Sequence, residues 1–266
     1  MTVVGVDVGG TKIAAGVVDV GTGIVLAEAR RETPAREGAE AVLTACRELV
    51  DEVAPAGAAA IGVGLCEFVD RSGEPSSGVT IDWRGLDVAT ALGAGARVRI
   101  ESDVRAAARA EARFGAGRPF GDFVYLTVGT GISHCLVLAG EPYPGARGNA
   151  IVVGAPPVER VASGSALARL AGVARAEEVL ADPARAALVD SAAVALGLAL
   201  AALVNALDPE AVVVGGGLGL VDTYRERAVA AARREIDHER TRELPIVPAQ
   251  LGERSGLIGA ALAAAG

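Results

Sequence analysis

Three glycine turns, each after a short apolar run, carry the clearest chemical signal in this sequence. They are Gly9-Gly10-Thr11, Gly129-Thr130-Gly131 and Gly215-Gly216-Gly217. Because glycine has no side chain, backbone N–H groups in such turns can approach an anion closely. One glycine turn after a strand is usually only a turn, but three together favour a cleft that closes around one polyanion, such as a nucleoside triphosphate.

The first turn lies between two apolar runs and is flanked by groups that suit a phosphate site. Thr11 adds a hydroxyl donor, Lys12 a positive charge, and Asp7 a carboxylate that could hold a hydrated Mg²⁺ beside a phosphate. The pattern differs from the P-loop, whose glycines lead into a helix, since a second apolar run follows at once. An ordinary hairpin with a soluble turn would fit the same residues, so the rest of the chain has to decide.

Glu101-Ser102-Asp103 brings a carboxylate to the end of another short strand, directly before a helix that we expect from residue 104 to about 114. A carboxylate in this position can orient an alcohol and take its proton during phosphoryl transfer. It can also cap the following helix. Asp103 is therefore the candidate catalytic base, and the two roles are compatible.

The elements around these residues alternate between strand and helix, which is typical of an α/β protein. A strand, a glycine turn and a strand recur at 123–138, after a boundary at 115–119, and this weak duplication predicts two similar lobes. We expect an N-terminal lobe over residues 1–117, which a C-terminal helix at about 251–266 joins, and a C-terminal lobe over 118–250. The expected strands are 3–8, 13–19, 24–27, 59–65, 98–100, 123–127, 132–138, 211–214 and 246–247, and the expected helices are 38–53, 104–114, 165–170, 176–180, 183–207, 221–236 and one from about 255.

The composition argues against several classes of function. The net charge is −8 and no run of Lys or Arg lacks interspersed acids, so we expect no nucleic-acid partner. The three cysteines lie far apart and only two histidines are present, which leaves no zinc constellation and fits a reducing cytoplasm. The start lacks the basic residues of a signal peptide. The apolar stretch 192–207 is too short to span a bilayer, so we expect a buried helix there and no membrane association.

Four motifs, in order and spacing, resemble those of the ROK family of sugar kinases and repressors. They are 7–12, Glu101-Ser102-Asp103, 126–132 and 213–217. The resemblance covers essentially the whole chain and implies the two-lobed actin-like or hexokinase-like ATPase fold, of the RNase H-like class. Family repressors carry a DNA-binding domain before the first motif, which here starts at residue 3, so the resemblance points to the kinase branch. It implies ATP and Mg²⁺ as cofactors, a sugar-like substrate and a homodimer.

The same resemblance implies roles for individual residues. Asp103 would be the base that takes the proton from the attacking sugar hydroxyl, and Asp7 would lie near the metal. ATP and its phosphates would be bound by Asp7, Gly9, Gly10, Thr11, Lys12, Gly129, Thr130, Gly131, Gly215 and Gly216, the last two against the adenosine. The substrate would be bound by Glu67, Thr80, Ser102, Asp103, Gly148, Asn149 and Glu159.

The acceptor side of the motif set departs from the family pattern. Val152 stands at the position of a glutamate that binds sugar hydroxyls, Ala155 stands at that of a histidine, and the zinc-binding loop that normally follows is absent. Ser102 and Arg105 replace two motif asparagines, and Cys66-Glu67 replaces a Pro-Gly pair. The loss of polar partners predicts poor binding of glucose, because buried hydroxyls that lose hydrogen bonds cost about 1–3 kcal/mol each.

We therefore expect ATP-dependent phosphorylation of a primary hydroxyl on an amino sugar, such as kanosamine, or on a cyclitol. Glu67 and Glu159 could pair with an amino group, although both would also fit plain surface charges. The alternatives left open are a non-catalytic regulator that keeps nucleotide binding, an ordinary glucokinase, and polyphosphate as the phosphoryl donor. A transcriptional repressor would need a DNA-binding segment, and we expect none.

Overall fold

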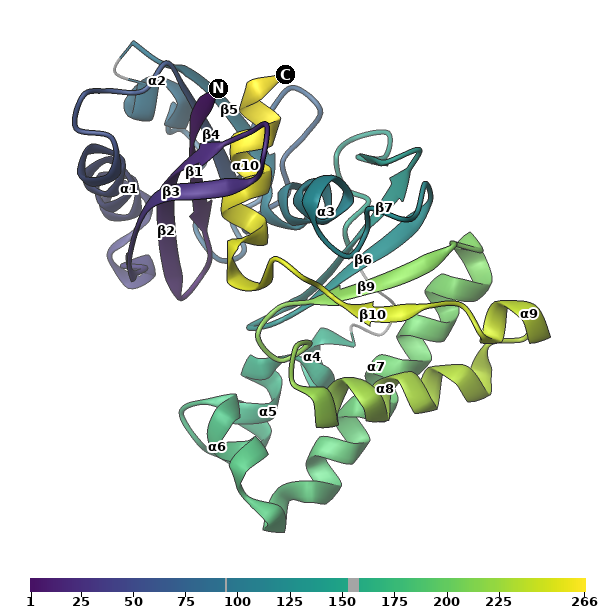
Figure 1. Ribbon diagram of the computed structural model, residues 1–266. Helices are drawn as coiled ribbons and strands as arrows, with labels where there is room; N and C mark the ends of the chain where they lie inside the picture. Colours follow the sequence, from purple (N-terminus) through teal and green to yellow (C-terminus); the bar gives the residue numbers. More distant parts are fainter. Residues whose placement is uncertain (94, 153–157) are drawn as a thin grey trace.

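The computed structural model describes residues 1–93, 95–152 and 158–266, and it has two lobes, each built on a five-stranded sheet (Figure 1). The N-terminal sheet contains β1 (Thr2–Val8), β2 (Lys12–Asp19), β3 (Ile24–Glu32), β4 (Ala60–Leu65) and β5 (Arg97–Ser102), in the order β3-β2-β1-β4-β5. The C-terminal sheet contains β6 (Phe123–Val128), β7 (Ile132–Leu138), β8 (Glu141–Pro142), β9 (Ala211–Gly215) and β10 (Ile246–Pro248), in the order β10-β9-β6-β7-β8.

Both sheets repeat the same unit, which confirms the predicted α/β fold. An antiparallel hairpin, β1 with β2 or β6 with β7, pairs on its first strand with a parallel strand, β4 or β9. The helices of the first part of the chain are α1 (Ala39–Val53), α2 (Val88–Gly93) and α3 (Asp103–Phe114). Those of the remainder are α4 (Glu159–Ala162), α5 (Gly164–Ala171), α6 (Ala176–Ala181), α7 (Ala186–Leu207), α8 (Asp222–Glu235), α9 (Glu239–Arg242) and α10 (Ser255–Ala265).

Side-chain alternation on β1 and β2 determines which helix covers which face of the N-terminal sheet. Val4 and Val6 pack in one core cluster with Leu49 of α1, whereas Val3 packs in another with Leu257 of α10. Successive side chains of a strand point to opposite faces, so this unbroken apolar run is buried on both sides. The last helix thus returns to the N-terminal lobe, where Figure 1 shows it beside β1 and β4.

Helices also cover both faces of the C-terminal sheet. Leu126 packs in a cluster with Leu196 of α7 and Tyr224 of α8. On the other face, Tyr125 packs in a cluster with Ala108 of α3. Because α3 belongs to the first part of the chain but packs on the second sheet, it lies between the two lobes (Figure 1).

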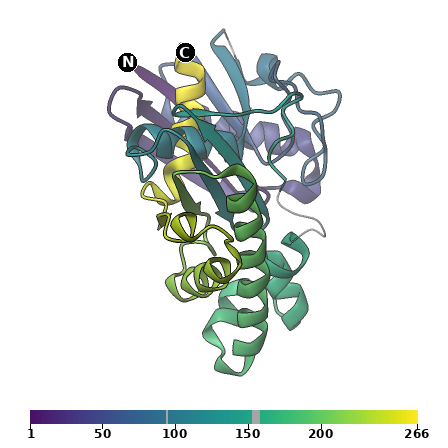
Figure 2. The same ribbon diagram turned by 90° about the vertical axis from the view of Figure 1, so that its right-hand side faces the viewer.

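The helix α7 is longer than the apolar stretch 192–207 suggests. Together with the turn before it, Pro183–Leu207 is long and apolar enough, by length and composition, to cross a membrane, so the length argument from the sequence does not hold for the whole helix. However, Val189, Leu200 and Val204 of α7 are buried in the core cluster that α8 and the sheet complete. Figure 2 shows α7 as the long green helix that runs along the C-terminal lobe.

One buried carboxylate joins the two crossings of the chain between the lobes, at 115–122 and 249–254. Glu111 of α3 is completely buried. Its carboxylate accepts hydrogen bonds from the backbone N–H groups of Ala116 (2.8 Å), Gln250 (3.1 Å) and Leu251 (2.9 Å) and from Ser255 Oγ (3.0 Å). Both connections between the lobes are therefore held at a single point on α3.

The predicted elements agree with the structure where the sequence is strongly periodic. The opening hairpin and the helices α1, α3, α5, α6 and α8 have their predicted positions within two residues. The strand β3 continues to Glu32, well past the expected end. The short elements α2, α4, α9 and β8 were not predicted, because so few residues show no recognisable period.

Candidate active site

Two aspartates lie at the carboxyl ends of strands in the N-terminal sheet. Asp7 is near the end of β1, and Asp103 follows β5 as the first residue of α3, with β4 between the two strands. Gly64 of β4 shows how close they are. A Cβ atom at Gly64 would lie 3.7 Å from Asp7 Oδ1 and 3.5 Å from Asp103 Cα. The sheet topology thus brings together two acids that are far apart in the sequence.

Burial changes the ionisation of both aspartates. It raises the pKa of Asp103 to about 7, and the negative charge of Asp7 adds to the rise. The Val104 N–H donates to Asp103 Oδ1 (2.6 Å) and acts in the opposite direction. Burial also raises the pKa of Asp7 to about 6, although the charges of Arg30 and Lys12 oppose it. A carboxylate with a pKa near neutrality suits a general base, because a substantial fraction is ionised at pH 7 and it accepts a proton readily.

Ser102, and not Asp103, occupies the N-cap position of α3, which corrects the capping interpretation of Asp103. The Ser102 side chain is completely buried and makes no capping hydrogen bond. Among the described residues its Oγ has no hydrogen-bond partner. Buried hydroxyl groups normally have a partner, and this one belongs to the residue directly before the candidate base.

A cavity of about 140 Å³ lies over the two aspartates. Its lining comes from both lobes and from the start of the last helix: Asp7, Asp103, Val104 and Ala107; Tyr125, Thr127 and Gly216; and Gly252, Glu253, Ser255 and Gly256. Of the residues predicted from the sequence, it gathers Asp7, Asp103 and Gly216. A site lined by both lobes can be closed and shielded from water by a movement of one lobe against the other.

The first two glycine turns occupy equivalent positions in the two lobes. Each is closed by its own backbone, through Gly9 N–H to the Lys12 carbonyl (3.0 Å) and Gly129 N–H to the Gly131 carbonyl (2.9 Å). The hydroxyl groups of Thr11 and Thr130 lie 3.4 Å apart, so the two turns meet across the lobes. Lys12 Nζ lies 3.2 Å from Glu253 Oε2, at the rim of the cavity.

The third glycine turn packs against the end of β6. Gly216 has a φ of 80°, and a Cβ atom there would overlap the backbone of Val128. A Cβ atom at Gly215 would overlap the hydroxyl of Tyr125. A Cβ atom at Gly129 would be 3.9 Å from Gly217 N, so the second and third turns are neighbours. All three glycine turns therefore converge on the space between the lobes.

Glu67 lies near the aspartates, but its carboxylate is used within the protein. The residue is only 3% exposed. It accepts hydrogen bonds from Ser77 Oγ and from the N–H groups of Val79 (2.9 Å), Thr80 (2.5 Å) and Ile81 (2.8 Å). The structure thus assigns this side chain to the loop 77–81, instead of to the surface or to a substrate amino group. The Thr80 methyl group lies against Gly10, next to the first glycine turn.

The other predicted acceptor residues lie in the C-terminal lobe. Glu159 is exposed at the start of α4, and its Oε2 accepts a hydrogen bond from the Ile132 N–H (2.7 Å) beside the second glycine turn. Gly148 is buried and Asn149 is exposed in the loop after β8. None of these three residues lines the cavity over the aspartates.

The altered acceptor positions are only partly within the described residues. Val152 is 58% exposed, and Ala155 lies outside them. Within residues 1–93, 95–152 and 158–266 there is no group of three or more His, Cys, Asp or Glu side chains that could hold a metal ion.

Sequence reasoning missed several residues of the site. Tyr125 and Thr127 are two residues apart on β6, so their side chains point to the same face, and both line the cavity. The two-residue period of the strand could therefore have identified them. Glu253 and Gly256 have no local signal, because only the return of α10 brings them to the cavity. Arg105 was noticed only as a departure from the family motif.

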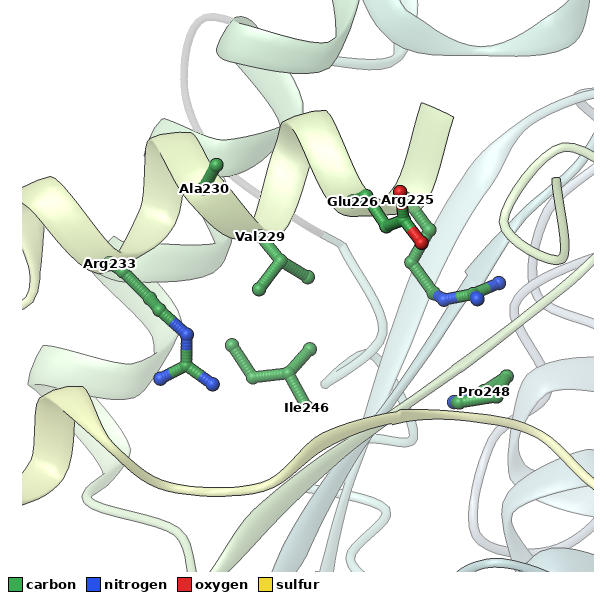
Figure 3. A pocket seen from close by; sticks show the side chains of 7 residues that line it. All are labelled: Arg225, Glu226, Val229, Ala230, Arg233, Ile246 and Pro248. Atoms are coloured by element: carbon green, nitrogen blue, oxygen red, sulfur yellow. The ribbon is translucent and has the colours of Figure 1, made fainter. Parts of the chain in front are cut away.

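A larger depression, of about 370 Å³, lies between α8 and β10 (Figure 3). Its floor is apolar, and Arg225 and Arg233 lie along it. Both guanidinium groups bond backbone carbonyls, Arg225 that of Gly219 (3.3 Å) and Arg233 that of Leu244 (3.3 Å). Its lining includes neither the aspartates nor the glycine turns, so it is separate from the candidate active site.

Comparison with known proteins shows similarity over the whole chain. The model of the ROK family matches residues 3–266. A glucokinase from Streptomyces coelicolor is 31% identical over 97% of this chain and 96% of its own length. The bifunctional enzyme NanE/NanK from Brucella melitensis is 37% identical over 63% of this chain, and the match spans only 35% of that relative.

A solved structure is similar as well. A ROK family glucokinase from Streptomyces griseus, in complex with glucose and AMPPNP, superposes with a TM-score of 0.87 at 28% identity. The match covers 100% of this chain and 99% of the other.

Proposed function

The chain belongs to the ROK family, and on that basis we propose that it is a kinase that transfers the γ-phosphoryl group of ATP to a hydroxyl group of a sugar or sugar-like acceptor. The observation that carries the proposal is the cavity between the lobes. There a carboxylate with a pKa near 7 lies beside a second acid, and the lining comes from both lobes and includes Gly216 of the third glycine turn.

The described residues divide the work of phosphoryl transfer. Asp103 would orient the acceptor hydroxyl and take its proton as the oxygen attacks the γ-phosphorus. The turns at 9–11 and 129–131 would donate N–H and hydroxyl groups to the phosphates from both sides. Gly215 and Gly216 pack closely on β6, where a Cβ atom would clash within the protein, and this packing would hold the third turn in place beside the nucleotide.

The acidic groups present fit a magnesium ion that arrives with the nucleotide. No dedicated cluster of ligands occurs among the described residues, and Mg²⁺ commonly keeps waters and phosphate oxygens as most of its ligands. Asp7 is the residue that would hold its hydrated form. When bound, the ion would neutralise charge on the phosphates.

The acceptor we propose is less hydroxylated than glucose, or carries a different polar pattern, as in an amino sugar such as kanosamine or a cyclitol. Val152 presents an exposed aliphatic side chain where the family has a hydroxyl-binding glutamate. Ser102 offers a buried hydroxyl without a partner among the described residues. Because the Glu67 carboxylate is already fully engaged, Glu159 is the remaining candidate to meet an amino group.

The test is ADP release from ATP and Mg²⁺ with a panel of glucose, amino sugars and cyclitols as acceptors. We expect one of the latter two classes to exceed glucose in kcat/KM.

Asp103→Asn should lower kcat by about 100- to 10,000-fold, because the amide cannot accept the proton. The kcat/KM of the native enzyme should rise with pH and level off above about 7, where Asp103 is ionised.

Two outcomes would contradict the proposal in different ways. If glucose is the best acceptor, the chain is an ordinary glucokinase and the proposed acceptor class is wrong. If no acceptor raises ADP release above that of Asp103→Asn, the kinase proposal fails and a non-catalytic nucleotide-binding regulator takes its place.

A further inference from the structure

Arg105 of α3 is a buried cation whose guanidinium reaches three separate segments of the chain. Its side chain is only 2% exposed. Nε donates to Glu101 Oε1 (2.6 Å), one terminal nitrogen donates to the Gly148 carbonyl (2.6 Å), and the other donates to the Val69 carbonyl (2.7 Å). Every nitrogen of the guanidinium therefore has a partner.

The three partners lie on different segments of the chain that meet at Arg105. Glu101 is in β5, directly before Ser102 and Asp103. Val69 is in the long excursion between β4 and α2, the same excursion that Glu67 holds together. Gly148 is in the loop between β8 and α4 of the C-terminal lobe, where the sequence departs from the family pattern. Arg105 itself is two residues after Asp103.

The contact between the two loops is close. Gly148 has a φ of 83°, and a Cβ atom there would overlap the Val69 carbonyl oxygen and lie 2.7 Å from Asp70 Cα. The backbones of the two lobes are thus in close contact here, and the carbonyl groups of Val69 and Gly148 both accept hydrogen bonds from the Arg105 guanidinium. A planar fork can satisfy two carbonyls and a carboxylate at once, which a lysine ammonium cannot do in the same geometry.

Burial of the Arg105 guanidinium costs free energy that its partners must offset. A guanidinium out of water is unfavourable unless it is paired and hydrogen-bonded. Near a helix N-terminus it also opposes the helix dipole. Glu101 supplies the charge, but an apolar side chain could fill the same space without these requirements. We take the geometry as a sign that the position serves to fix the loops relative to the first turn of α3.

We infer that Arg105 is the positioning residue of the acceptor site: it fixes the loop around Gly148 relative to Asp103. This inference rests on the proposed function, since it concerns the acceptor of the same reaction. The residue does not touch the reacting atoms. It sets the distance between the base and the hydroxyl that the C-terminal loop presents, and a displacement of about 1 Å can lower a reaction rate by about 100-fold.

The experiment compares Arg105→Lys with Arg109→Lys, its matched control. Arg109 lies one turn further along α3 and also reaches the C-terminal lobe, but its partner is the exposed carboxylate of Glu141 (2.5 Å). We expect Arg105→Lys to lower kcat/KM for the acceptor by about 10- to 100-fold with the KM for ATP within about twofold of native. Arg109→Lys should leave both values within about twofold, because exposed ion pairs contribute little.

Amide hydrogen exchange gives a second readout that does not depend on finding the acceptor. In Arg105→Lys, exchange should become faster at 66–81 and 143–152 together, whereas Arg109→Lys should leave both segments unchanged.

If the native chain phosphorylates nothing on the panel, the proposed function fails while exchange still tests the role of Arg105. Should Arg105→Lys fail to fold, Glu101→Gln removes the compensating charge and keeps the guanidinium, and the same pattern is expected. A folded variant with native kinetics for the acceptor, or with native exchange in both segments, overturns the inference.

Discussion

Asp103 combines two properties that oppose each other in a folded protein. The burial that brings its pKa from 3.8 to about 7 also makes its charged form unfavourable in the folded state. The folded protein holds the proton more tightly than the unfolded chain does. The contribution of this group to stability is therefore complete below about pH 4 and is lost as the pH rises through about 7. A carboxylate that titrates near neutral pH, as the candidate base does, thus lowers the stability of the protein above that pH.

Removal of this charge should stabilise the protein while it removes the proposed activity. We expect Asp103→Asn to raise the free energy of unfolding by about 2 to 4 kcal/mol near pH 8, with a difference close to zero near pH 4. Urea denaturation of both proteins across this range measures the effect.

Asp70→Asn is the matched control, with the opposite sign. The Ser72 hydroxyl and neighbouring N–H groups lower the pKa of Asp70, so its charged form is the one favoured on folding. We expect Asp70→Asn to be less stable than native near pH 8. An Asp103→Asn variant that is also less stable there would contradict the burial argument.

Adjacent glycines of one turn differ in how strictly the surrounding structure requires glycine. Gly216 has a positive φ and lies directly under the Val128 backbone, whereas a Cβ atom at Gly217 would meet nothing within 4 Å. The two residues are adjacent in the same turn, yet only one of them is required by the packing of β9 against β6. A substitution in this turn can therefore separate steric necessity from simple proximity to the nucleotide.

Gly216→Ala should weaken nucleotide binding much more than Gly217→Ala does. The alanine has to move away from Val128 and adopt an unfavourable backbone conformation, which costs about 1–3 kcal/mol and displaces the turn. We expect the Kd for a non-hydrolysable ATP analogue, measured by calorimetry, to rise at least about tenfold for Gly216→Ala and to stay within about twofold for Gly217→Ala. Equal effects of the two substitutions would show that the turn does not depend on this contact.

At the scale of the whole molecule, the two lobes are joined through one buried carboxylate. Glu111 accepts hydrogen bonds from both crossings of the chain, and the helix that carries it starts at Asp103. The helix packs on the C-terminal sheet and on α10. Asp103, the two connections between the lobes and the start of the last helix are thus linked through α3.

Glu111→Gln should destabilise the protein even though the two side chains have the same shape. The amide NH₂ group would face N–H donors, and the charge that strengthens these hydrogen bonds would be lost. We expect the free energy of unfolding to fall by about 2 to 3 kcal/mol. Chemical denaturation tests this, with Glu226→Gln on the exposed face of α8 as a control that should change it by less than about 0.5 kcal/mol. A native-like Glu111→Gln would mean that the crossings are held by other contacts.

The sequence by itself determined the features that depend only on residues close together in the chain. Apolar alternation and helical spacing were sufficient for the opening hairpin and for most helices, because these patterns act within one element. The turns at 9–11 and 215–217 were recognisable from their glycines. Asp103 was recognisable from its place between a strand and a helix, although the N-cap position of that helix is occupied by Ser102.

The tertiary structure alone decided which distant groups meet. Nothing near Glu67 in the sequence shows that its carboxylate holds the loop 77–81, nor does anything near Arg105 indicate Gly148 as its partner. The meeting of Thr11 with Thr130 likewise depends on how the two lobes pack. Local sequence specifies the conformation of a segment, but the partner of a buried polar group is set by segments far along the chain. For this reason the glycine turns could be predicted from the local sequence, whereas the contacts of Glu67 and Arg105 required the fold.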